Sequence, residues 1–166
     1  MITQNKTNVR RKRRRGSQRE DTVYYVLEIK DWEWSFSFGV NPTKYGDGDG
    51  PYSDYRHLQL RGNLLRPTKV KALDVDWTFL PDRELNEDKR ARHEPNAVGS
   101  LQLHRGHLTG LLSIPSDALP SVLQMVIAGR FKFVVAHGDR LRYGRAAIRH
   151  YRLEMTIRDD DLPLEA

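Results

Sequence analysis

Residues 32–40 read WEWSFSFGV, with a large apolar side chain at every second position. Successive side chains of a β-strand point to opposite faces, so this alternation predicts a strand with one buried face. We expect the aromatic row to pack in the core; lining a ligand groove is the alternative. The preceding stretch, 23–29, is rich in β-branched and aromatic residues and predicts another strand, with Lys30 and Asp31 as the turn between the two.

Shorter apolar patterns farther along the chain predict more strands. They cover residues 57–64, 69–80, 101–103, 108–114, 131–136 and 148–157. Arg105 and Gly106 separate two of these stretches and predict a hairpin turn. Residues 41–55 and 81–96 are rich in Gly, Pro or charged residues, and we predict that they form loops.

One segment has the apolar spacing of an amphipathic helix. Its apolar residues recur three or four positions apart, at Leu119, Val122, Leu123, Val126 and Ile127. Ser116 is the expected N-cap, and Gly129 is expected to end the helix because glycine readily adopts the left-handed conformation found there. The pattern predicts one short helix over about 117–128.

These elements predict a mainly-β fold. Few strands alternate with helices, which argues against a parallel α/β sheet. We therefore expect an antiparallel β-sandwich or open barrel of about 7–9 strands, with one short amphipathic helix. The predicted organisation is a disordered Arg-rich arm over 1–21, a single β-rich domain over 22–158 and an acidic, frayed tail over 159–166.

The positive charge of the chain is concentrated at its start. The net charge is +6. Residues 1–20 hold eight Lys or Arg and one Glu, whereas residues 21–166 hold twenty Lys or Arg and twenty-one Asp or Glu. Attraction to polyanions is therefore expected of the arm rather than of the whole body.

The arm gives the strongest functional signal in the sequence. Its unbroken basic run consists of Arg10, Arg11, Lys12, Arg13, Arg14 and Arg15. Clustered cationic side chains neutralise phosphates and release counterions, so the run predicts nucleic-acid binding. The alternatives are a nuclear import signal, a solubilising tail and a contact with an acidic protein.

A second basic cluster lies between residues 130 and 152. It comprises Arg130, Lys132, Arg140, Arg142, Arg145, Arg149 and Arg152, with Tyr143 and Tyr151 interleaved. Arginine forks and aromatic faces together suit single-stranded nucleic acid, and the candidate contacts are Arg140, Arg142, Arg145 and Arg149. The alternative, which the near-neutral body favours, is that these arginines lie on exposed strand faces and pair with carboxylates.

Several other classes of site find no support in the sequence. The chain has no cysteine, which excludes disulfides, thiolate catalysis and cysteine–zinc sites. His104 and His107 flank a turn without a third zinc ligand, and Asp47 and Asp49 lack the Glu that closes a calcium loop. No phosphate-loop or nucleophile-elbow motif occurs, so no catalytic residue, metal or cofactor is predicted. No apolar run is long enough to span a bilayer or to form a secretory signal.

The sequence therefore predicts a small non-enzymatic binding protein that is cytoplasmic or, in a eukaryote, nuclear. Its arm is expected to contact nucleic acid or another polyanion. The alternative is a structural or protein–protein interaction module whose β-domain surface is the working site. Binding through the arm should weaken steeply with ionic strength, whereas a shape-driven protein interface should not.

Overall fold

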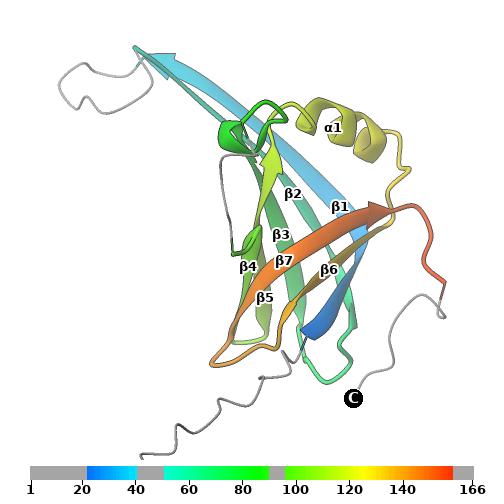
Figure 1. Cartoon of the computed structure of the whole chain (residues 1–166). Coiled ribbons are helices and arrows are strands. Elements are labelled where there is room, and N and C mark those ends of the chain that lie inside the picture. The colour runs from blue at the N-terminus through cyan, green and yellow to red at the C-terminus, as the bar shows by residue number, and fades with distance from the viewer. Residues whose placement is uncertain (1–21, 41–50, 90–95, 159–166) are drawn as a thin grey trace, which may run out of the picture.

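The structure is a computed structural model that describes residues 22–40, 51–89 and 96–158. Within these residues it contains seven β-strands, one α-helix and one short 3-10 helix (Figure 1). The strands are β1 (Thr22–Val40), β2 (Tyr52–Arg66), β3 (Asp74–Asp82), β4 (Gly99–His104), β5 (His107–Pro115), β6 (Phe133–Asp139) and β7 (Arg145–Glu154). The helix α1 covers Leu119–Ile127, and the 3-10 helix η2 covers Arg83–Leu85. The predicted arm and acidic tail lie outside the described residues.

The seven strands hydrogen-bond in one closed ring, in the order β1-β2-β3-β5-β4-β7-β6. The prediction of a mainly-β fold with one short helix is thus confirmed. The expectation of an antiparallel sheet holds for every neighbouring pair except β3 and β5, which are parallel. This exception arises because β5, the second strand of the β4–β5 hairpin, is the strand that pairs with β3. β4 therefore lies on the side of β5 that faces away from β3.

β1 runs without interruption through the turn that was predicted at Lys30 and Asp31. Ile29 pairs with Gly62 and Asp31 pairs with Arg61, so Lys30 is the extra residue of a β-bulge. The bulge moves the core-facing positions of β1 from odd-numbered to even-numbered residues. Two apolar patterns that are out of phase in the sequence therefore belong to one long strand.

The barrel interior is filled by apolar side chains from every strand. The largest that are fully buried in this core are Trp77, Tyr25, Phe79, Leu27, Leu58, Leu60, Leu101, Leu108, Leu112, Ile148 and Val134. In the described part of the chain, no charged side chain is buried. Burial of apolar surface therefore stabilises the barrel.

The aromatic row of residues 32–40 joins this core only in part. Trp34 packs against the core, but Phe36, Phe38 and Val40 are 59%, 64% and 72% exposed. The expectation that the whole row is buried is therefore wrong. β6 and β3, the neighbours of β1 and β2, end before this part of the hairpin, and no other described strand covers it.

The helix α1 lies across one end of the barrel (Figure 1). Leu119 and Val126 are buried, Val122 and Leu123 are half-buried, and Ile127 is 60% exposed. The predicted apolar face is thus confirmed except at its last residue. No helix in the described residues is long and apolar enough to cross a membrane.

Of the two predicted ends of α1, the C-terminal one is confirmed and the N-terminal one is wrong. Gly129 has a φ of 64°, and its N–H donates to the carbonyl oxygen of Val126 (2.9 Å), so it ends the helix as predicted. The expected N-cap at Ser116 is wrong, because the N-cap residue is Ala118 and makes no side-chain capping bond. The Ala118 N–H donates to the carbonyl oxygen of Pro115 (3.0 Å), which places Ser116 inside the turn that precedes the helix.

Several predicted boundaries also shift; the predicted loop 81–96, for example, begins with the last two residues of β3 and the 3-10 helix η2. β2 already begins at Tyr52, so residues 52–55 are strand rather than loop, and the rest of that predicted loop is described only at residue 51. β3 begins at Asp74, so residues 69–73 belong to a connection rather than to a strand. There the Leu73 N–H donates to the carbonyl oxygen of Gly106 (2.7 Å), which ties this connection to the β4–β5 turn.

The strand directions give the barrel two ends with different connections. We call residues 66–73, 103–108 and 140–145 the basic end, because they join β2 to β3, β4 to β5 and β6 to β7. The helix end consists of the described connections from β3 to β4 and from β5 to β6, residues 83–89, 96–98 and 116–132.

Candidate nucleic-acid interface

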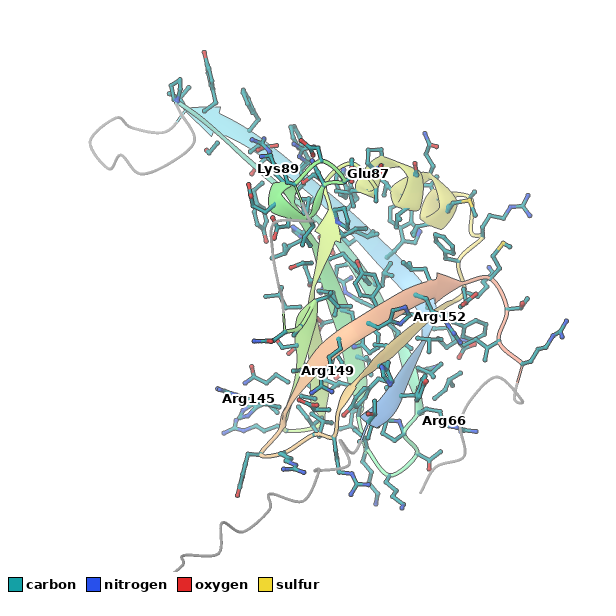
Figure 2. All side chains as sticks on the ribbon, viewed as in Figure 1. Arg66, Glu87, Lys89, Arg145, Arg149 and Arg152 are labelled. Atoms are coloured by element: carbon teal, nitrogen blue, oxygen red, sulfur yellow. The ribbon has the colours of Figure 1, made fainter. Side chains whose placement is uncertain are left out.

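The basic end gathers positive charge from three separate parts of the chain. Its cationic residues are Arg66, Lys69, Lys71, Arg105, Arg140, Arg142 and Arg145, and its three segments contain no Asp or Glu. Figure 2 shows Arg66 and Arg145 at this end and Glu87 and Lys89 at the opposite end. The three connections therefore form a predominantly positive surface, which Asp74 and Asp139 border at the adjoining strand ends.

The predicted arm is joined to the barrel at this same end. Thr22, the first described residue, pairs with Asp139 at the last position of β6. The predicted arm contacts, Arg10 to Arg15, lie outside the described residues. Chain connectivity nevertheless attaches the Arg-rich arm directly beside the turn that contains Arg140 and Arg142.

Two of the three connections are two-residue turns. Arg105 and Gly106 have φ values of 50° and 83°, and Tyr143 and Gly144 have φ values of 52° and 74°. Positive φ at both central residues is the pattern of the type I′ hairpin turn, which confirms the predicted turn at Arg105 and Gly106. A non-glycine residue in this conformation costs about 1–2 kcal/mol, so Arg105 and Tyr143 hold their exposed positions at some expense in stability.

Backbone hydrogen bonds hold these turns side by side. The Leu103 N–H donates to the carbonyl oxygen of Gly144 (2.7 Å), which joins the β4–β5 hairpin to the β6–β7 turn. The β4–β5 turn is also bonded to the 66–73 segment through Leu73 and Gly106. The cationic side chains therefore project from a backbone whose three segments are fixed relative to one another.

The core supports the β6–β7 turn from below. The hydroxyl of Tyr25 donates to the carbonyl oxygen of Asp139 (2.8 Å), and Leu141 packs against the core cluster. Burial raises the pKa of Tyr25 to about 12, so this hydroxyl stays protonated and remains a donor at neutral pH.

Three of the four arginines predicted as contacts in the barrel are available to a ligand. Arg140, Arg142 and Arg145 are exposed, and none of them forms an ion pair with another described residue. The alternative interpretation, in which these side chains pair with carboxylates, does not hold for them. They are free to bind phosphate through their guanidinium forks.

Arg149, the fourth predicted contact, lies in a different environment. It is the extra residue of a β-bulge between β6 and β7, and its Nη2 lies 2.8 Å from Oδ1 of Asp139. Its side chain is 34% exposed. The carboxylate offsets part of its charge, so Arg149 fits the carboxylate-paired alternative.

His137 lies near this arginine and adds no positive charge at neutral pH. Burial, and then the charges of His150 and Arg149, lower the pKa of His137. Its ring lies 4.8 Å from that of Tyr24, centroid to centroid. The uncharged imidazole therefore packs on the barrel wall rather than attracting phosphate.

The rest of the predicted cluster does not belong to the basic end. Arg130 and Lys132 lie at the helix end, and Arg152 contacts Glu154 (2.9 Å) near the end of β7. Tyr151 is also unavailable, because its hydroxyl donates to the carbonyl oxygen of Ser113 (2.8 Å) and burial raises its pKa to about 12. Of the two interleaved tyrosines, only Tyr143 is fully exposed.

Four cationic residues of the basic end, Arg66, Lys69, Lys71 and Arg105, were not among the predicted contacts. Lys69 and Lys71 were assigned to a strand, and Arg105 was interpreted only as a turn residue. A signal for them was nevertheless present in the predicted strand order. Successive antiparallel strands reverse direction, so every second connection lies at the same end of the sheet.

No group of three or more His, Asp or Glu side chains in the described segments is arranged to hold a metal ion. Asp47 and Asp49 lie outside those segments. His107 contacts Asp76 instead, with Nε2 2.8 Å from Oδ2. This contact joins the parallel strands β3 and β5 beside the basic end.

No family model, curated protein or solved structure matches this chain. The candidate interface is therefore defined by the geometry and charge of the chain itself.

Proposed function

We propose that the chain is a non-enzymatic protein that binds nucleic acid through its basic end together with the Arg-rich arm. The observation that carries this proposal is the convergence of three connections with seven Lys or Arg, against the flanking carboxylates Asp74 and Asp139, at the point where the arm joins the barrel. Positive charge at one end of the barrel attracts a polyanion, orients it during encounter and concentrates it at that end.

The exposed side chains favour single-stranded nucleic acid. Tyr143 is held at the tip of a tight turn between Arg142 and the start of β7, with its ring open to solvent. Bases of a single strand stack on such rings, while arginines on either side contact the backbone phosphates. A base-paired duplex offers this ring no free base face.

A cytoplasmic location, or a nuclear one in a eukaryote, suits this function because nucleic acid is present there. One observation favours the alternative of a protein-interaction module. The far part of the β1–β2 hairpin exposes apolar side chains, among them Phe36 and Phe38, at a distance along β1 from the basic end.

The experiment is a titration of fluorescent 20-nucleotide single strands and duplexes with the full chain and with a variant that lacks residues 1–21. Residues 1–21 hold eight Lys or Arg and two acidic residues, a net charge of +6. Each phosphate contact adds roughly 0.7 to the slope of log K against log salt for single strands. Deletion should therefore lower both the affinity and the slope, and should leave weak residual binding by the barrel.

The residual binding separates the two basic regions. Changing Arg140, Arg142 and Arg145 to Ala in the shortened chain should abolish it. If neither the full chain nor the shortened chain binds any nucleic acid at low salt, the proposal is wrong and the interaction module becomes the better account.

A further inference from the structure

The β1–β2 hairpin extends beyond the closed barrel. β6 pairs with β1 only as far as Glu28, and β3 pairs with β2 only from Leu58 onwards. Residues 35–40 and 52–57 pair with each other alone among the described strands, and we call them the hairpin extension. In Figure 1 it projects from the barrel at the same end as α1.

The core-facing side of the sheet continues into one face of this extension, which is apolar along β1 and at Tyr52 and carries Asp54 and Arg56 along the rest of β2. We define the aromatic face as Trp32, Phe36, Phe38, Val40 and Tyr52, which are 39%, 59%, 64%, 72% and 60% exposed. The register places these residues on the same side as the buried Leu58 and Leu60. The rings of Phe38 and Tyr52 stack with their centroids 5.6 Å apart, so the face is continuous.

The exposed area is large for a chain of this size. Aromatic side chains have roughly 150–250 Å² each, so the aromatic face leaves on the order of 500 Å² of apolar surface in water. That lies near the upper limit for a single patch on a monomer, and larger patches usually mark interaction sites. Two such faces packed together bury about 1,000 Å², which is the lower bound for a specific protein–protein interface.

The charges on this face indicate a second copy of the chain as the occupant. Asp54 and Arg56 lie opposite Phe38 and Phe36 on the same side of the hairpin and form an ion pair, and Arg83 approaches Asp54 at 3.5 Å. A face with both signs has no net attraction for a polyanion. A two-fold axis, in contrast, brings the carboxylate of one copy near the guanidinium of the other.

We propose that the chain forms a two-fold dimer in which the aromatic faces of two hairpin extensions pack against each other. Strands of packed sheets lie about 10 Å apart, and the exposed phenylalanines can interdigitate across that distance. The basic ends then lie away from the interface, so the dimer leaves both of them accessible. This proposal does not depend on the proposed function.

The test is sedimentation velocity on the full chain, treated with nuclease and kept in high salt so that nucleic acid cannot bridge two copies. The expected mass is twice 19.3 kDa at high protein concentration, and it should fall towards the monomer on dilution. The double variant Phe36→Ser, Phe38→Ser should weaken association at least about tenfold, because buried aromatic residues dominate interface energetics. Leu111→Ser, at a residue of β5 that is 52% exposed, should leave association unchanged.

A second measurement guards against misfolding of the double variant. The chain has no cysteine, so Val40→Cys introduces one thiol on the aromatic face. A short bismaleimide should link two copies of this variant in high yield and two copies of Leu111→Cys in low yield. The proposal is overturned by a chain that stays monomeric at about 1 mM. It is equally overturned if the folded double variant dimerises as the parent does, or if single-stranded DNA competes for the aromatic face.

Discussion

At the basic end the chain twice reverses direction in two residues, whereas at the helix end it makes the long connections 83–98 and 116–132. The short turns hold exposed cationic side chains and bury little. The long connection 116–132 contributes α1, which buries Leu119 and Val126 against the core. The apolar contacts of α1 and the exposed cationic side chains of the short turns therefore lie at opposite ends of one barrel.

This separation suits the proposed binding for a physical reason. A charged side chain on a two-residue turn starts from a backbone fixed by ladder hydrogen bonds, so less entropy is lost when a ligand orders it. At the other end, α1 packs against the core through Leu119 and Val126. Changes at the basic end should therefore alter binding, and changes at the helix end should alter stability.

The largest expected effect is on stability at the helix end. Leu119→Ala should lower the free energy of unfolding by about 2–5 kcal/mol, because Leu119 is 2% exposed and its loss leaves a cavity. Denaturant unfolding measures this. Tyr143→Ala at the basic end is the matched control, and it should stay within about 0.5 kcal/mol of the parent. A similar loss of unfolding free energy in both variants would show that the two ends contribute equally to stability, against this expectation.

A smaller effect of opposite sign is expected in the turns. Arg105→Asn and Tyr143→Asn should each raise the free energy of unfolding by about 0.5–1 kcal/mol, because Asn tolerates positive φ better than Arg or Tyr. Both variants should also bind single strands more weakly. Arg142→Asn is the control, since Arg142 is not among the positive-φ residues and should gain no stability. Unchanged binding of single strands by both turn variants would show that Arg105 and Tyr143 do not belong to the interface.

The smallest effect concerns pH and the barrel wall near the basic end. Burial lowers the pKa of His137 below its ordinary value of 6.5, so the unfolded chain binds this proton more readily than the folded chain. The stabilisation is fully present above pH 6.5 and is lost as pH falls through the lowered pKa. The free energy of unfolding should fall less between pH 7.5 and 5.5 in His137→Gln than in the parent. If the free energy of unfolding has the same pH dependence in the two proteins, His137 does not contribute to the loss of stability at low pH.

The parts of the fold that the sequence predicts are those with local causes. Alternation identifies most strands, the three- and four-residue spacing identifies α1, and Gly129 marks its end because a left-handed residue is needed there. The bulge at Lys30 is harder to predict, because two out-of-phase apolar patterns look like two strands joined by a turn.

The remaining features depend on contacts between distant segments. Alternation over residues 32–40 shows that one face is apolar, but whether that face is covered depends on where β3 and β6 end. The same limit applies to the candidate site. Arg140, Arg142 and Arg145 are neighbours in sequence and were predicted together, whereas Arg105 joins them only through the strand order.

The central claim is that polyanion binding depends on where the charge lies and not only on how much there is. The chain offers a matched pair of triple variants for this test. Arg140, Arg142 and Arg145 are changed to Ala in one, and Arg130, Lys132 and Arg152 are changed to Ala in the other. Both lose three positive charges from the same stretch of sequence, the first from the basic end and the second from the helix end and the adjoining end of β7, where Arg152 contacts Glu154.

The deciding measurement is the salt dependence of binding of these two full-length variants to a single-stranded oligonucleotide. The basic-end variant should lose at least about tenfold in affinity at low salt, and its slope of log K against log salt should fall by roughly 2, at about 0.7 for each lost phosphate contact. The helix-end variant should retain the affinity and slope of the parent. Equal losses in both variants would contradict the account, because binding would then follow net charge alone.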